Sequence, residues 1–409
     1  MTDQRALGRV SMVAALRYRD FRYFWTATAL ESAGKWMEAV VLGWLVLKMT
    51  GSPLMVGIAA ASRWLGYALG PVFGMMADRY DRRKLLIAVA ALGVVYSATL
   101  AFLAATGTVR YWHILVIGLV AGMGHAFDIP LRFALAGDLV DKRDLTNAVA
   151  LSTVALDVTA MLGPAVAGPL INVIDIAGVC WLLTFNYALN VLALYVLRPP
   201  PAVERKAGRP TWGDLINGAR YIRGNHPVVA LLLMAIVFNL LHFPLRYALL
   251  PVLADSVLGV GAPGYGFLLA VAGAGALVGA AVVAGLGSSR HEARLCIIAS
   301  VAVGILAGAF CLSSRYGLSL VLIGFVGLAE GIAMTTMPAL LLALTPVEMR
   351  GRVMGVRSLA ILPLSLGNLV SGAMAGQFGA PVAGVVNASL HALLIAIIAV
   401  AVPSLRKSE

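Results

Sequence analysis

Nine charged side chains lie inside long apolar stretches of the sequence, and these residues are the best placed to do chemistry. They are Glu31, Lys35, Glu38, Arg63, Asp128, Arg132, Asp157, Arg246 and Glu330. If these stretches cross a membrane, a charge at the centre of a lipid-facing helix costs roughly 2.5–3.5 kcal/mol. We therefore expect all nine side chains to face a polar interior, as in pathways for protons or polar solutes.

The spacing of these charges places several of them on common helix faces. Glu31, Lys35 and Glu38 stand at positions i, i+4 and i+7, which share one face of a helix. Asp128 and Arg132 stand at i and i+4, where opposite charges partly neutralise each other. Two interpretations stay open: static ion pairs that fix helix packing, or groups that bind a substrate or exchange a proton.

Histidines accompany two of these groups. His242 and Arg246 are also four residues apart, and together they would suit an anionic group of a substrate. A packed histidine is the alternative interpretation of His242. His125 lies one turn before Asp128 and belongs to the same face.

Four of the carboxylates, those of Glu31, Glu38, Asp157 and Glu330, lie near the middle of their apolar stretches. Desolvation favours the neutral form of a carboxyl group, and a cationic neighbour favours the charged form. Competition between these effects lets a carboxyl group exchange a proton against a substrate. The sequence does not indicate which of the four does so.

An enzyme inside the membrane would need a metal cluster, or a nucleophile with its base. No His, Asp or Glu grouping has the spacing of metal ligands, and no such nucleophile is evident. We therefore expect no metal, no cofactor and no catalytic activity.

The elements that carry these residues are apolar runs long enough to cross a bilayer. The chain has 409 residues, 60% of them hydrophobic and only 12% charged, and its mean hydropathy is +0.90. A spanning helix needs about 20 apolar residues. Twelve runs meet this length, near residues 23–48, 54–77, 85–106, 112–135, 146–171, 176–197, 228–253, 264–287, 295–313, 318–344, 358–376 and 382–403.

One long polar interval divides these spans into two sets of six. We expect an N-terminal six-helix bundle over 1–197, a linker with an amphipathic surface helix over 198–227, and a second six-helix bundle over 228–409. The halves look like copies, because Gly122 and Pro130 in the fourth span parallel Gly327 and Pro338 in the tenth.

The distribution of basic residues predicts the orientation. Twenty-four lysines and arginines fall before, between or after the spans on one side, and only Lys48, Arg110 and Arg315 on the other. Because cytoplasmic loops are enriched in these residues, we expect a multi-pass protein of the inner (cytoplasmic) membrane with both termini in the cytoplasm. The net charge of +12 is spread over short loops, so it does not indicate a nucleic-acid partner.

The loop after the second span has an uncommon spacing of glycine and charges. It contains Gly74, Asp78, Arg79, Arg82 and Arg83. Glycine allows a neighbouring helix to approach closely, and Asp78 is placed to pair with an arginine or a helix N-terminus. We expect a conformational latch, and a plain basic membrane anchor is the alternative.

The fifth span contains Gly163, Pro164 and Gly168. Small residues with a proline make a bendable helix with a flat packing face. We expect a hinge here, and ordinary close packing of helices is the alternative.

The loop over residues 74–84 resembles the signature of the major facilitator superfamily, with Asp81 in place of its second glycine. This departure, and the stretches 43–53, 127–132 and 147–151, resemble the bacterial drug and siderophore exporter branch, which includes the enterobactin exporter and macrolide efflux proteins. The resemblance implies an all-α membrane protein of twelve transmembrane helices in two pseudo-symmetric bundles. It also implies a cavity lined by the first, fourth, seventh and tenth helices.

The resemblance predicts a secondary exporter of small amphipathic molecules, drugs or siderophore-like compounds, driven by proton antiport. The element at Gly163–Gly168 resembles one that is associated with antiporters. A proton-coupled uptake symporter on the same fold is the closest alternative, and an intramembrane enzyme is the alternative from another class. The expected partners are the small-molecule substrate, protons and the lipid bilayer, and we expect a monomer.

Overall fold

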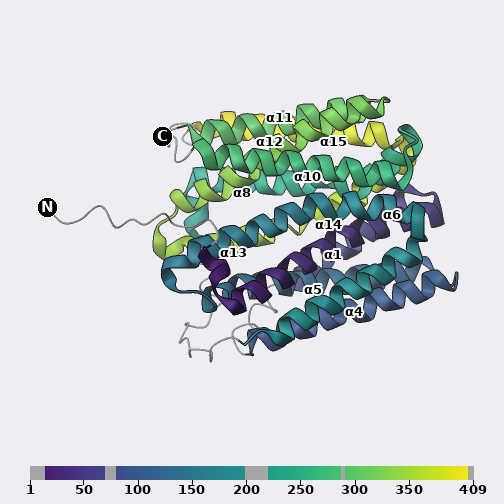
Figure 1. Ribbon diagram of the computed structural model, residues 1–409. Coiled ribbons are helices and arrows are strands. Elements are labelled where there is room, and N and C mark those ends of the chain that lie inside the picture. The colour runs from purple at the N-terminus through teal and green to yellow at the C-terminus, as the bar shows by residue number, and fades with distance from the viewer. Residues whose placement is uncertain (1–13, 70–79, 199–219, 287–290, 404–409) are drawn as a thin grey trace.

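The computed structural model describes residues 14–69, 80–198, 220–286 and 291–403, and the regular structure of these residues is helical throughout (Figure 1). In the first half, the helices are η1 (Ala14–Arg17), α1 (Arg19–Thr50), α2 (Pro53–Leu65), η2 (Gly66–Leu69), α4 (Arg82–Ala105), α5 (Tyr111–Asp138), η3 (Lys142–Asp144) and α6 (Leu145–Val196). Helix α6 contains two spans, because Asp175 has non-helical backbone angles (φ 58°, ψ 173°).

The second half repeats this arrangement. Its helices are α8 (His226–Val237), η4 (Phe238–His242), η5 (Leu245–Leu249), α9 (Leu250–Val252), η6 (Leu253–Val257), α10 (Gly261–Leu286), α11 (Glu292–Leu312), α12 (Tyr316–Ala343), α13 (Val347–Leu359), α14 (Pro363–Phe378) and α15 (Ala380–Ala401). The segment from α8 to η6 is one continuous span, and η4, η5 and η6 are π-helical turns within it. Turns of this kind occur frequently at functional sites.

The expected twelve spans are confirmed, with three local differences. Nine helices of the described part are long and apolar enough to cross a membrane, counting α6 once. Helix α1 is not among the nine because Glu31, Lys35 and Glu38 make it too charged. Only the first part of the second span is described. The eleventh span is α13 and α14, joined by a turn over residues 360–362.

Local signals in the sequence explain where α1 ends and α2 begins. Gly51 has a positive φ of 59° and its amide donates to the carbonyl of Leu47, which is a usual helix C-cap for glycine. Ser52 then caps α2, and Pro53 occupies its first turn, where no amide donor is needed. The chain therefore reverses direction within a few residues.

The outer helix faces are apolar and exposed, as lipid-facing surfaces must be. Val173, Leu312 and Val400 are 76%, 74% and 68% exposed. Because such side chains would not face water along a whole bundle, these faces fit the hydrocarbon of a bilayer.

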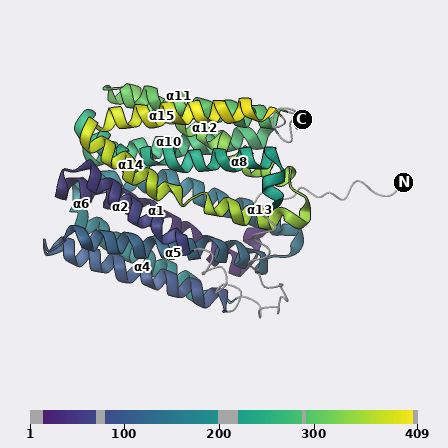
Figure 2. The ribbon, with the colours of Figure 1, turned by 180° about the vertical axis from the view of Figure 1, so that it is seen from behind.

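The two halves touch through pairs of glycines. Gly57 of α2 faces Gly372 of α14, and a methyl group added at Gly57 would lie 2.8 Å from the Cα of Gly372. Gly168 of α6 faces Gly266 of α10 in the same way, at 2.9 Å. Figure 2 shows α2 beside α14. A side chain at these positions would force the helices apart.

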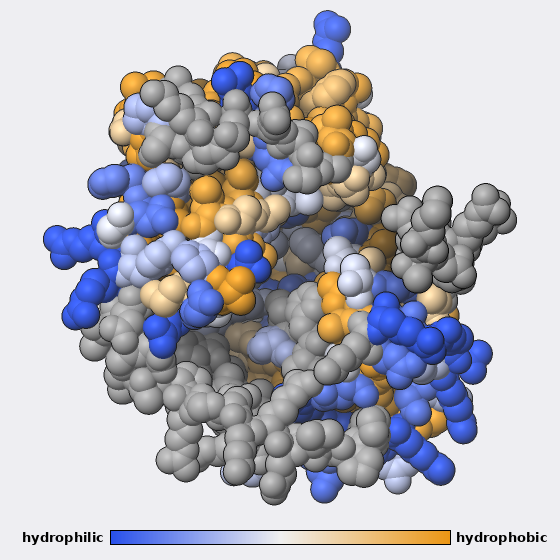
Figure 3. Space-filling model, turned by 90° about the vertical axis from the view of Figure 1, so that its left-hand side faces the viewer, coloured by the Kyte–Doolittle hydropathy of each residue, from blue (hydrophilic) through white to orange (hydrophobic). Residues whose placement is uncertain are grey.

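The halves meet at the end of the molecule where α1 stops. There the Lys48 ammonium pairs with Asp255 of the other half at 2.8 Å, and Trp44 stacks on Tyr265 with ring centroids 6.4 Å apart. At the opposite end, where α1 begins, the surface is hollowed between the halves (Figure 3).

The boundaries 1–197, 198–227 and 228–409 stay a prediction, because residues 199–219 of the linker lie outside the described part. Of the expected amphipathic helix, only residues 220–224 are described, and they are helical.

We predict that Gly57→Ala or Gly168→Ala opens the end at which the halves touch. Overpacking costs about 1–3 kcal/mol, which favours the conformation in which these helices separate. Cysteines introduced at Lys48 and Asp255 report the change through their cross-linking yield with a short bifunctional reagent. The native cysteines Cys180, Cys296 and Cys311 are buried and free.

Gly285→Ala is the matched control, because a methyl group there would meet no atom within 4 Å. We expect the cross-linking yield to fall several-fold in either test variant and to stay at the wild-type level in the control. Equal yields in all variants would contradict a role for the glycine pairs in closing this end.

Candidate functional site

Glu38 is held by three short hydrogen bonds in the first half. It is 2% exposed. The Arg63 guanidinium of α2 donates to it at 2.6 Å, and the hydroxyls of Tyr96 on α4 and Tyr187 on α6 donate at 2.9 Å each. A buried carboxylate with this set of donors is a fixed structural ion, because removing Arg63 leaves an unmatched charge and removing either tyrosine hydroxyl leaves a hydrogen bond unmade.

A second pair lies on α5. The Nε of Arg132 donates to both carboxylate oxygens of Asp128, at 2.8 and 2.7 Å, as the i, i+4 spacing predicts. Arg132 also donates to the hydroxyl of Thr28 on α1 at 3.2 Å. Both charged side chains are buried, so they join α5 to α1 within the apolar interior.

Glu31 lies between these two pairs. It accepts a hydrogen bond of 2.6 Å from Asn190 of α6. His125 Nε2 is 3.6 Å from its nearer oxygen, and Arg132 Nη2 is 3.8 Å away. The other ring nitrogen of His125 is 3.4 Å from Arg63, which links the two pairs. We call Glu31, Glu38, Arg63, His125, Asp128 and Arg132 the N-terminal cluster.

The second half contains a smaller cluster. Glu330 of α12 contacts His242 at 3.1 Å and Arg246 at 2.9 Å, both through the same oxygen. His242 ends the π turn η4 and Arg246 lies in the next one, η5. We call these three residues the C-terminal cluster. The sequence placed His242 and Arg246 together but not beside Glu330.

The two clusters share a composition. Each has a glutamate between a histidine and an arginine, and each joins the first and fourth spans of its half. In the first half Glu31 comes from α1 and the other two from α5. In the second half Glu330 comes from α12 and the other two from the seventh span.

Two predicted site residues contact no other charge in the described part of the chain. The Asp157 side chain on α6 is half-buried, and no described residue bonds to it. Lys35 is half-buried on α1, and its ammonium lies more than 4 Å from every described carboxylate. Its backbone carbonyl accepts from Arg63 at 3.4 Å.

Three residues of the site escaped the sequence analysis: Tyr96, Tyr187 and Asn190. They lie on the third and sixth spans, where no formal charge occurs. Buried polar groups need partners, so isolated polar side chains within these apolar runs were the available signal. Asn190 is fully buried, and Tyr187 is as well.

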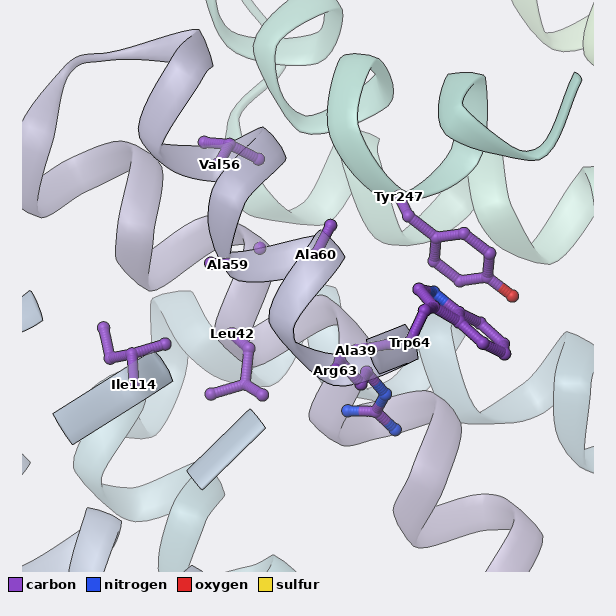
Figure 4. Close-up of a pocket in the computed structure, with 10 residues that line it drawn as sticks. Ala39, Leu42, Val56, Ala59, Ala60, Arg63, Trp64, Ile114 and Tyr247 are labelled. Atoms are coloured by element: carbon purple, nitrogen blue, oxygen red, sulfur yellow. The ribbon is translucent and has the colours of Figure 1, made fainter. Parts of the chain in front are cut away.

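A small pocket lies between the halves beside Arg63 (Figure 4). Tyr247 from the second half faces Trp64, with ring centroids 5.1 Å apart, and Trp64 also stacks on Tyr67 at 4.9 Å. The pocket holds about 40 Å³, enough for a few water molecules. A drug-sized ligand needs roughly 300–1,000 Å³, so these rings must separate to admit one here.

The predicted latch is described only in part, because Gly74, Asp78 and Arg79 lie outside the described residues. Arg82 pairs with Asp138 at the end of α5 at 2.7 Å. Arg83 donates to the backbone carbonyls of Leu194 and Tyr195 on α6. These two arginines therefore tie α4 to its neighbours within the first half, and their role as a latch stays a prediction.

Asp81, the departure from the family signature, has a local structural reason. Its carboxylate caps α4 by accepting from the backbone amides of Arg83 and Lys84, at 2.9 and 3.2 Å. Glycine could not supply this cap.

The predicted hinge residues lie in close helix contacts. A methyl group added at Gly163 would lie 3.0 Å from the Cβ of Trp36 on α1, and Gly168 faces Gly266. The backbone of α6 is helical through Pro164. These residues form the flat packing face that the sequence suggested, and bending at Pro164 stays a prediction.

Twelve helices in two similar halves, with paired charges inside each half, define a membrane transporter of the major facilitator superfamily. The model of the transmembrane secretion effector family matches residues 10–409, and the chain belongs to this family. It is a transporter, and the superfamily that the sequence suggested is confirmed.

Relatives extend over most of the chain. Macrolide efflux protein A of Streptococcus pyogenes is 21% identical over 88% of this chain and 90% of its own length. The enterobactin exporter EntS of Shigella flexneri is 25% identical over 93% of this chain and 90% of its own length. The multidrug efflux pump Tap of Mycolicibacterium fortuitum is 24% identical over 94% of this chain and 95% of its own length.

Solved structures share the fold. The nucleoside transporter NupG gives a TM-score of 0.72 at 12% identity, with 93% of this chain and 98% of that chain covered. A POT family transporter in complex with 5-aminolevulinic acid gives a TM-score of 0.76 at 12% identity, with 95% of this chain and 96% of that chain covered. At this identity the likeness shows the fold alone.

We predict that Glu38 and Arg63 depend on each other for stability. Glu38→Gln leaves the buried Arg63 charge unmatched and should lower the free energy of unfolding by about 3–5 kcal/mol. The double variant Glu38→Gln with Arg63→Gln should lose clearly less than the sum of the single losses. Denaturant unfolding in detergent measures all three. Additive losses would show that the pair does not act as a unit.

Proposed function

We propose that the protein is a secondary exporter of small amphipathic molecules that works by proton antiport and alternating access. One observation carries this proposal: each half encloses its own charged cluster, while the described residues join the halves through facing glycines and buried apolar side chains, with the ion pair of Lys48 and Asp255 at one end. Each half can then rotate as a unit, exposing the interior to one side of the membrane at a time.

The orientation follows from the basic loops. The hollowed end carries the start of α1 and the Lys- and Arg-rich loops, so we assign it to the cytoplasm, with both termini there, in the cytoplasmic membrane. The described conformation is then open to the inside, which is the state in which an exporter loads its substrate.

Direction and substrate class rest on the relatives. They are a macrolide efflux protein, a multidrug efflux pump and an exporter of enterobactin. Their cargoes differ widely, which suits an interior with both aromatic walls and charges. Uptake by symport on the same fold is the second candidate, because direction depends on coupling and not on architecture.

The interior has groups for both parts of an amphipathic substrate. Trp64, Tyr67 and Tyr247 offer aromatic surface between the halves. Arg246 bonds Glu330 through one nitrogen and is 16% exposed, so its other N–H groups are open to an anionic group of a substrate. The sequence predicted substrate or proton roles for Glu31, Lys35, Glu38, Arg63, Asp128, Arg132, Asp157, His242, Arg246 and Glu330. We keep this proposal for all of them except Glu38 and Arg63, whose pair we assign to helix packing.

We predict that inside-out membrane vesicles take up a substrate when their lumen is acidified. A macrolide and a catecholate siderophore are the first compounds to test, with uptake followed by radioactivity or fluorescence. A protonophore should abolish the uptake, because the proton gradient supplies the driving force. Vesicles without the protein provide the baseline.

Other outcomes of the vesicle experiment are equally informative. Gradient-driven uptake in right-side-out vesicles only would support the symporter and contradict export. Uptake that is the same with and without a proton gradient would contradict proton coupling.

We predict that Arg246→Gln selectively weakens transport of compounds with a carboxylate. A hydrogen bond to a charged group contributes about 1.5–3 kcal/mol, so the concentration for half-maximal transport should rise about tenfold or more. Transport of a neutral analogue should change less than about threefold. Arg315→Gln, at an exposed loop residue, is the control. Equal losses for both compounds would contradict an anion contact.

A further inference from the structure

The N-terminal cluster has one more carboxylate than it has paired cations. Arg63 contacts Glu38 at 2.6 Å, and Arg132 contacts Asp128 at 2.7 Å. Both pairs are buried and neutral overall. Glu31 is the third carboxylate of the cluster, and no cation of the described residues lies within hydrogen-bond distance of it. If it were ionised, no cationic hydrogen bond would compensate its charge in a site that is 6% exposed.

The histidine and arginine nearest to Glu31 lie just beyond hydrogen-bond distance. His125 Nε2 is 3.6 Å away and Arg132 Nη2 is 3.8 Å away, whereas a hydrogen bond needs about 3.2 Å or less. Both nitrogens are buried and have no hydrogen-bond partner among the described residues. The neutral amide of Asn190 does reach the carboxyl group, at 2.6 Å.

The geometry around His125 indicates a neutral ring. Arg63 Nη2 lies 3.4 Å from Nδ1, and a guanidinium can only donate, so Nδ1 is the acceptor and the proton is on Nε2. His125 therefore offers Glu31 an N–H group without a positive charge. A protonated His125 ring would also be repelled by the positive charge of Arg63.

The remaining groups around Glu31 give it no cationic hydrogen bond. Glu38 and Asp128 are carboxyl groups that each bond an arginine, and the hydroxyls of Tyr96 and Tyr187 donate to Glu38. Lys35 is one turn along α1, and its ammonium lies beyond 4 Å from the carboxyl group. The described residues of α1, α4, α5 and α6 thus surround Glu31 without a cationic hydrogen bond.

Resting on the proposed function, we propose that Glu31 is the carboxyl group that carries the exchanged proton, and that it is protonated in this conformation. Movement of α5 towards α1 by less than about 1 Å would bring His125 and Arg132 into hydrogen-bond distance. The carboxylate is then stabilised, the O–H bond of Glu31 breaks, and the proton passes to water in the interior. On the outer side the reverse movement lets the carboxylate take up a proton.

Glu330 is the natural comparison. It has the same two partner types, but at 3.1 and 2.9 Å, within hydrogen-bond distance. This carboxylate stays ionised, held by Arg246 and His242. The two glutamates have the same partner types, and the distances to those partners differ by less than about 1 Å. This difference decides that Glu31 is protonated and Glu330 is ionised.

The test is the infrared C=O stretching band of neutral carboxyl groups, measured at pH 7 on the purified full chain without ligand. Exposed carboxyl groups are ionised at this pH and do not contribute. We expect Glu31→Gln to remove the area of one carboxyl group from the band, and Glu330→Gln, which removes the carboxylate paired with Arg246, to leave that area unchanged. An unchanged band in Glu31→Gln, or loss of the same area in Glu330→Gln, would overturn the proposal.

A second pair of variants covers the case in which Glu31→Gln does not fold. Asn190→Ala removes the hydrogen bond that the Asn190 amide donates to Glu31, and it should shift the frequency of the C=O band. Asn387→Ala removes a buried amide that bonds Ser371 in the other half, and should leave the frequency unchanged. An unshifted band in Asn190→Ala would also overturn the assignment.

Failure of this proposal is distinguishable from failure of the proposed function. Vesicle uptake that ignores the proton gradient would contradict antiport, whatever the band shows. Gradient-driven export together with an unchanged band in Glu31→Gln would keep the antiporter and place the proton elsewhere.

Discussion

The need to pair the most deeply buried charges inside the membrane governs this structure. An ion in hydrocarbon is costly unless a partner of opposite charge and hydrogen bonds compensate it. The chain meets this need within each half: Arg63 with Glu38 and Arg132 with Asp128 in the first, Arg246 with Glu330 in the second. Because these pairs do not cross between the halves, the halves can move relative to each other without breaking any of them.

The contact between the halves follows a different principle. Gly57 with Gly372 and Gly168 with Gly266 let the backbones approach closely, and close packing of this kind involves no desolvated charge. The ion pair between Lys48 and Asp255 is partly exposed, at 49% and 35%, and such pairs contribute little. An interface without buried ion pairs can separate without exposing an unpaired charge to hydrocarbon, as alternating access requires.

The two clusters show how the same residue types take different roles. Glu38 is surrounded by three donors and fixes the packing of α1, α2, α4 and α6. Glu31, two turns earlier on the same face, receives one neutral donor. Their positions in the sequence are alike, and only the neighbouring helices distinguish a structural ion from a group that is free to change its proton content.

The twelve spans and the family could be predicted from the amino-acid sequence. Bilayer thickness sets the length of an apolar run, and local caps such as Gly51 and Ser52 set its ends. The pair of Asp128 and Arg132 was also predictable, because its partners share one helix face. The other pairings depended on how the helices pack against one another. Arg63, Asn190 and Glu330 reach their partners from helices 25, 159 and 84–88 residues away in the chain, and helical periodicity carries no information about such contacts.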